Sequence, residues 1–188
     1  MKIKAKISVK GIKPLLFHTF PISVLSEKNS KSGEDEWQST VLMDENRRLY
    51  VMNTYFVNSI KDGGKEIKVG RGNLAKKLAS TLEIEEMKIF LDDLKVPEKE
   101  NLLKLDTEPV YLDIRAVVNP MTKGKNLRYR IAAKAGWTCS FTISWDDYIA
   151  SKEQVKTCVE NGGLFQGVGD GRSIGFGRYE VISFEMIK

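Results

Sequence analysis

The sequence GVGDGRSIGFG, residues 167–177, decides the fold and places five glycines in eleven residues. Glycine allows positive φ angles and close approach of the backbone, and consecutive exposed amides in such a loop can bind a phosphate. Arg172 inside the loop and Arg178 just after it would add charge-assisted contacts. The alternative is a tight turn that serves only the fold. The candidate binding glycines are Gly167, Gly169, Gly171, Gly175 and Gly177.

The elements on either side of this loop exclude two common glycine-rich nucleotide motifs. Residues 151–154 read Ser-Lys-Glu-Gln, a capping box that predicts a helix, and Val155, Cys158 and Val159 follow at helical spacing. A strand is expected after the loop, at residues 177–186. The loop is not a P-loop, because no Gly-Lys-Ser/Thr follows, and it is not a Rossmann turn, which would follow a strand rather than a helix.

Alternation of apolar and polar residues marks most of the remaining chain as strands. It is clearest at residues 2–10, where lysines and serine alternate with apolar side chains, and at residues 137–145. A polar loop is expected at residues 26–36. The further predicted strands are 38–44, 48–52, 110–118 and 127–133, the last two forming a hairpin, and a short helix begins at Asn53 or Thr54 and ends at Gly63-Gly64.

Residues 65–107 are predicted to be an insertion within a single domain that spans residues 1–188. They hold a helix near 73–81, a strand near 82–90 and an acidic linker; residues 83–108 carry nine acids and four lysines. Without the insertion, the order of elements predicts an α+β, ferredoxin-like (RRM-like) βαββαβ core with an antiparallel sheet. Both helices would then cover one face of the sheet, and the lysines of the first strand would lie on the open face.

The loop resembles the signature of the RAMP superfamily of CRISPR-associated proteins. Its residues fit G-h-G-x5-G-h-G, where h is apolar, between the last helix and the last strand of a ferredoxin-like unit. The resemblance covers the loop and, more loosely, residues 1–25, 50–63 and 108–188. It implies binding or processing of guide RNA, and a thumb-like insertion that contacts RNA and neighbouring subunits. The chain is also similar to small RAMP-like proteins of phages and mobile elements.

Basic residues gather in blocks, which favours one anion-binding surface on a chain of net charge +5. Solvated surface is the alternative for each block, and the hairpin arginines could instead pair with Asp113 or belong to a lysine-rich edge strand. The candidate RNA-binding cations are Lys2, Lys4 and Lys6 on the first strand, Lys65, Lys68 and Arg71 in the insertion, and Lys123, Lys125, Arg128 and Arg130 on the hairpin.

His18 is the single histidine and lies in an apolar run that follows the first strand. In the RNA-cleaving branch of the superfamily that the chain resembles, a histidine serves as general acid or base, and a lysine or tyrosine stabilises the developing charge. No such partner is visible in the sequence, so a partly buried, structural histidine is the preferred interpretation. A metal-independent endoribonuclease that uses His18 remains the alternative.

We therefore predict a non-catalytic subunit that binds RNA, or single-stranded DNA, together with other RAMP-like subunits or copies of itself. A phage protein that mimics such a subunit through protein contacts is a further alternative. The sequence predicts no metal site and no cofactor, because its aspartates are scattered. Cys139 and Cys158 are expected as buried free thiols. No run reaches the roughly 18 apolar residues of a membrane span, and the N-terminus lacks a signal-peptide core, so the expected location is the cytoplasm.

Overall fold

A computed structural model describes residues 1–20, 33–102, 107–118 and 121–187. Most of the predicted polar loop at 26–36 lies outside the described residues. The elements, in chain order, are β1 (Lys2–Gly11), β2 (Leu15–Leu16), α1 (Glu36–Thr40), β3 (Arg48–Met52), α2 (Asn53–Gly63), β4 (Lys68–Val69), β5 (Gly72–Asn73), α3 (Leu74–Leu78), β6 (Glu83–Ile84), β7 (Lys88–Lys95), a 3-10 turn (Lys99–Asn101), β8 (Val110–Val118), β9 (Lys125–Ala133), β10 (Thr138–Asp146), α4 (Lys152–Asn161), a π-helical turn (Gly162–Gln166), a 3-10 turn (Arg172–Ile174) and β11 (Tyr179–Ile187).

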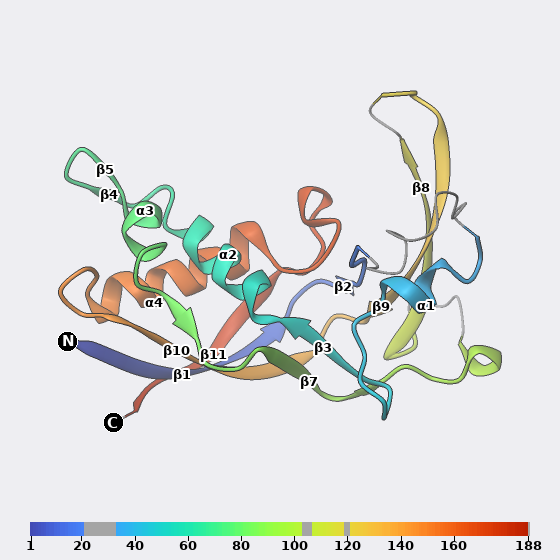
Figure 1. The fold of residues 1–188 in the computed structure, drawn as a ribbon, viewed down its shortest axis with the longest axis horizontal. Helices are drawn as coiled ribbons and strands as arrows, with labels where there is room; N and C mark the ends of the chain where they lie inside the picture. The colour runs from blue at the N-terminus through green and yellow to red at the C-terminus, as the bar shows by residue number, and fades with distance from the viewer. Residues whose placement is uncertain (21–32, 103–106, 119–120, 188) are drawn as a thin grey trace.

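The central sheet is antiparallel and has the strand order β11-β1-β10-β6. Helices α2 and α4 lie together on one side of it (Figure 1). The chain therefore runs β1, α2, β6, β10, α4, β11, which is the βαββαβ order, and the predicted ferredoxin-like α+β class is confirmed. The capping box predicted at Ser151 is present at the start of α4.

The second core strand differs from the one that the sequence suggested. The strand beside β10 is β6, which is only two residues long and comes from within the predicted insertion 65–107. The hairpin of β8 and β9 instead forms a separate sheet of order β2-β9-β8 and projects from the body of the molecule (Figure 1). Likewise β3 pairs with β7. The predicted strand 38–44 is wrong: residues 38–40 belong to helix α1, and of the remainder only Met43 forms an isolated bridge, with Leu49.

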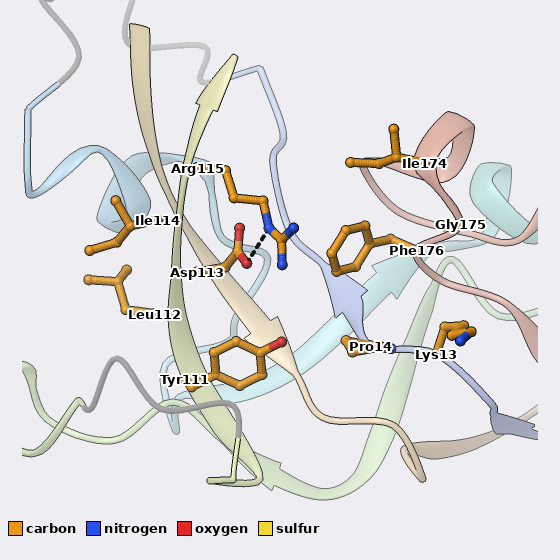
Figure 2. Close-up of a pocket in the computed structure, with 10 residues that line it drawn as sticks. All are labelled: Lys13, Pro14, Tyr111, Leu112, Asp113, Ile114, Arg115, Ile174, Gly175 and Phe176. Carbon is orange, nitrogen blue, oxygen red and sulfur yellow. Dashed lines mark hydrogen bonds and ion pairs between the residues drawn. The ribbon is translucent and has the colours of Figure 1, made fainter.

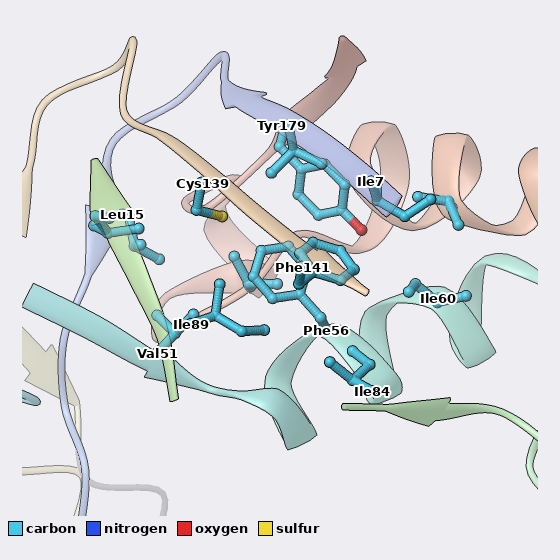
Figure 3. Packing of buried hydrophobic residues seen from close by; sticks show 14 of the residues in the cluster. Ile7, Leu15, Val51, Phe56, Ile60, Ile84, Ile89, Cys139, Phe141 and Tyr179 are labelled. Atoms are coloured by element: carbon cyan, nitrogen blue, oxygen red, sulfur yellow. The ribbon is translucent and has the colours of Figure 1, made fainter. Parts of the chain in front are cut away.

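The main core fills the space between the sheet and its two helices (Figure 3). The Phe56 ring, from α2, lies 4.4 Å from the Phe141 ring of β10 and 5.4 Å from the Tyr179 ring of β11, measured between centroids. Cys139 and Cys158 are buried and free, as predicted. Burial raises the pKa of the Cys158 thiol to about 12 and also raises the pKa of Cys139.

Strand β1 shows the predicted division of its side chains. Ala5, Ile7 and Val9 are fully buried beneath the helices, whereas the lysines at positions 2, 4, 6 and 10 are exposed on the other face. In the described part of the chain, no helix has the length and apolar character required to span a membrane.

Candidate nucleic-acid interface

The glycine-rich loop is held in a backbone conformation that only glycine adopts without strain. All five candidate glycines have positive φ, from +67° at Gly177 to +94° at Gly175. A Cβ on Gly177 would lie 1.8 Å from the Val168 carbonyl oxygen, and one on Gly169 would lie 2.6 Å from the Leu16 carbonyl oxygen. A Cβ on Gly175 would meet nothing within 4 Å. The close approach of two loop segments therefore explains most of these glycines.

Most amides of the loop are already bonded within the protein. The Gly177 amide donates to the Pro14 carbonyl at 2.7 Å, and the Asp170 amide donates to the Leu16 carbonyl at 2.9 Å. The amides of residues 167, 168, 171, 174, 175 and 176 also donate to the loop or to the end of α4. The sequence suggested consecutive free amides for a phosphate, but these bonds fasten the loop to β2 and leave the tip, residues 172–174, exposed.

Arg130 joins the glycine-rich loop to the hairpin rather than lying on an exposed strand face. Its side chain is 5% exposed, and its guanidinium donates to Asp170 of the loop at 2.8 Å and to Asp113 of β8 at 3.4 Å. Asp113 is equally buried and also accepts from Arg115 at 2.7 Å. The pairing with Asp113, which the sequence left as an alternative, is therefore present.

The remaining hairpin cations differ in whether another described residue contacts their charge. Arg128 is bonded to the carboxylate of Glu36 in α1. Arg115 lies over the Phe176 ring, with 4.8 Å from its Cζ to the ring centroid. Lys123 and Lys125, at the end of the hairpin, form no ion pair with any described residue, and Val117, Val118, Met121 and Leu127 expose apolar surface beside them.

A first groove lies between the base of the hairpin and the loop (Figure 2). It encloses about 570 Å³, and its walls carry Arg115, its partner Asp113 and Tyr111 from β8 and Phe176 and Ile174 from the loop, with Lys13 at its margin. Ile174 is 66% exposed. Tyr111 and Phe176 are only 4% and 8% exposed, so the groove offers a ligand mainly the guanidinium of Arg115 and the side chains of Ile174 and Lys13. A flat guanidinium can stack on an unstacked base, and a cation can contact a phosphate.

A second groove lies on the other side of the loop tip and encloses about 590 Å³. Its cations are Arg172 and Arg178, its exposed aromatic side chain is Phe165, and it also contains Asp62 and Asp170. Sequence analysis did not single out Phe165. An aromatic residue two positions after the Gly-Gly pair at the predicted helix end was the available signal.

The other predicted cations line neither groove, although Lys65 pairs with Asp62, which borders the second groove. Lys2 and Lys4 pair with Glu83 and Glu85 on the open face of the sheet, whereas the loop stands on the helix side (Figure 1). Lys6 lies opposite Glu185 of β11 in the sheet register. Lys65, which pairs with Asp62 at 3.3 Å, lies near the β4–β5 hairpin of Lys68 and Arg71, far from the β8–β9 hairpin (Figure 1).

The Nε2 atom of His18 lies 3.6 Å from the Oε1 atom of Glu36. The same carboxylate binds Arg128. The histidine side chain is 29% exposed, and its Nε2 is buried without a hydrogen-bond partner in the described structure. This is the partly buried setting that the sequence favoured.

Comparison with known proteins gives a match in structure only. No protein-family model and no curated protein matches the sequence. In fold, the chain is similar to a chain of a Type III-B Cmr complex. That structure is described as Type III-B Cmr-beta bound to cognate target RNA, and the similarity has a TM-score of 0.59 at 11% sequence identity. It covers 100% of this chain and 61% of the other, so this chain spans about three-fifths of that chain's length. At this identity the similarity supports the fold alone.

Proposed function

We propose that this chain is a non-catalytic, RNA-binding subunit of a CRISPR-like ribonucleoprotein. The observation that carries the proposal is the first groove, which lies between the glycine-rich loop and the base of the projecting hairpin and contains Arg115 and Lys13. Lys13 has no carboxylate partner in the described structure, and the same holds for Lys123 and Lys125 at the end of the hairpin. Elsewhere, most of the predicted candidates have acidic partners, which reduces the charge that they can offer to a phosphate.

The chemistry of the groove favours single-stranded RNA over a base-paired duplex. Arg115 lies over the Phe176 ring and is itself 48% exposed, so its flat guanidinium is the surface on which an unstacked base can lie, whereas Phe176 and Tyr111 are buried behind it. Phosphate contacts from the unpaired cations would add affinity with little sequence preference. The fold similarity to a chain of an RNA-bound assembly is in keeping with this proposal.

The projecting hairpin also fits a role in assembly. It carries exposed apolar side chains next to Lys123 and Lys125, a combination suited to contact with a neighbouring subunit and its RNA. We extend the proposal to assembly with other RAMP-like subunits or with further copies of this chain. We also propose that the chain forms one domain in which residues 65–107 are largely an insertion.

The test is the affinity for a short single-stranded RNA, measured by fluorescence anisotropy over a series of salt concentrations. The double variant Lys123→Glu and Lys125→Glu should bind at least about tenfold more weakly, because it loses two phosphate contacts. Each lost contact should also remove about 0.7 from the slope of log affinity against log salt. The matched control reverses Lys76 and Lys77, which are exposed on α3.

Purification under nuclease-free conditions provides the second arm, with sequencing of any nucleic acid that remains bound. A defined short RNA supports the proposal. Equal loss of affinity in both double variants would show that only net charge matters, and it would refute the assignment of the hairpin end to RNA binding. Protein free of nucleic acid, with no affinity for RNA but with tight association to a partner subunit, would favour the protein-mimic alternative.

A further inference from the structure

The second groove begins at the π-helical turn that ends α4. Gly162 and Gly163 lie against α2 and β11 so closely that a Cβ on Gly163 would be 2.2 Å from the Tyr179 carbonyl oxygen. Ser59 donates to the Gly162 carbonyl at 2.9 Å, and its hydroxyl lies 3.1 Å from that of Tyr179. This buried network fixes the turn, and π-helical turns occur frequently at functional sites.

The fixed turn presents an aromatic side chain that the core does not use. Phe165 is 62% exposed, and it borders the groove together with Gln166. An exposed ring on a rigid turn loses little conformational freedom when a flat ligand stacks on it, and aromatic rings stack on nucleobases regardless of sequence.

The two carboxylates of the groove are already neutralised by other cations. Asp170 binds Arg130 at 2.8 Å and accepts from the Gly171 amide at 2.8 Å. Asp62 pairs with Lys65 at 3.3 Å. Neither acid therefore compensates Arg172 or Arg178, and within the described structure both arginines lack an ion pair.

Arg178 provides a second, independent observation that points to an anionic ligand in this groove. Its Nη1 atom is buried and has no hydrogen-bond partner among the described residues. Burial and the nearby charge of Arg172 lower the pKa of the Arg178 guanidinium. A buried guanidinium nitrogen without an acceptor is costly, and an anion between the two arginines would satisfy it.

We propose that the second groove binds the phosphorylated end of a nucleic-acid strand, with the terminal phosphate between Arg172 and Arg178 and the terminal base stacked on Phe165. A terminal phosphomonoester carries about −1.5 to −2 charge near neutral pH, whereas a phosphodiester within a strand carries one negative charge. Two uncompensated guanidiniums match the former. The volume of about 590 Å³ lies in the range of small-ligand sites, roughly 300–1,000 Å³.

This inference rests on the proposed RNA-binding function and adds a preference for one kind of strand end. The same chemistry is shared by a free nucleoside monophosphate, so the experiment separates the two sources. The probes are one short RNA with a 5′-phosphate, the same RNA with a 3′-phosphate, the same RNA with hydroxyl ends, and AMP.

The expected result is that a phosphorylated end binds at least about tenfold more tightly than hydroxyl ends, the size of one charge-assisted hydrogen bond. Arg172→Ala and Phe165→Ala should each remove this preference, and both positions are exposed enough to leave the fold intact. Arg71→Ala, an exposed arginine of the β4–β5 hairpin, should keep it. Arg178→Gln should also remove it, with a melting temperature as the check on folding.

Each outcome decides one part of the proposal. If all RNA ends bind equally and Arg172→Ala changes nothing, the end site is refuted while RNA binding stands. If AMP binds in a manner that depends on Arg172 but no RNA binds, the phosphate site stands as a nucleotide site and the proposed RNA function fails. If neither RNA nor AMP binds, both proposals fail.

Discussion

The buried arginine Arg130 offers the sharpest test of how the loop and the hairpin hold together. We predict that Arg130→Ala lowers the free energy of unfolding by about 3 kcal/mol. Removing one partner of a buried ion pair costs about 3–5 kcal/mol, because the other charge stays buried without compensation. The lower end applies here, since Asp113 keeps Arg115 at 2.7 Å and Asp170 is 38% exposed and can be hydrated. For a chain of 188 residues, the melting temperature should fall by about 6–12 °C.

The assay is urea unfolding of the variant, followed by circular dichroism and by tryptophan fluorescence. Arg71→Ala is the control, because that arginine is exposed and has no ion pair with a described residue. A double-mutant cycle of Arg130→Ala with Asp170→Ala should give a coupling energy above about 1 kcal/mol. If Arg130→Ala is no more destabilising than Arg71→Ala, the reasoning is refuted, and the side chain would be available to RNA after all.

Two further predictions concern the loop and the core. Gly177→Ala should destabilise the protein by more than about 4 kcal/mol, because its Cβ would lie 1.8 Å from the Val168 carbonyl oxygen. Gly175→Ala places its Cβ in open space and should cost only about 1–2 kcal/mol of backbone strain. Equal effects of the two variants in thermal unfolding would contradict this. Cys158, with a pKa of about 12, is roughly one part in 10⁴ thiolate at pH 8, so a thiol reagent should label it only as the protein unfolds, and fast labelling of the native protein would disprove its burial.

The sequence predicted the parts of the fold that have a strong local pattern. Strands β1 and β10 alternate over nine or ten residues, and α4 carries a complete capping box, so each could be located without tertiary information. Strand β6 could not be found in this way, because two residues are too few to show a period. Its place beside β10 is decided by pairing with Ile143 and Ser144, about sixty positions further along the chain.

The site was less predictable, because the availability of a cation depends on acids that are remote in sequence. Alternation placed Arg130 on a polar strand face, but the last four residues of β9, Arg130 among them, are buried. Its partner Asp170 lies forty positions further along the chain. Lys2 and Lys4 are exposed as predicted, yet they pair with Glu83 and Glu85. Both acids lie in the strand predicted near 82–90, and nothing in the sequence placed that strand beside the first one.

These pairings change the way in which the glycine-rich loop can meet a ligand. A loop of free amides would bind phosphate through its backbone and would have to become ordered on binding. Here the amides are bonded to β2 and to the loop itself, and Asp170 is bonded to Arg130, so the backbone is ordered beforehand. Binding then falls to the side chains of Arg172 and Arg178, and pre-organisation lowers its entropic cost. Substitutions in the glycines should therefore reduce stability and affinity together, whereas Arg172→Ala should reduce affinity alone.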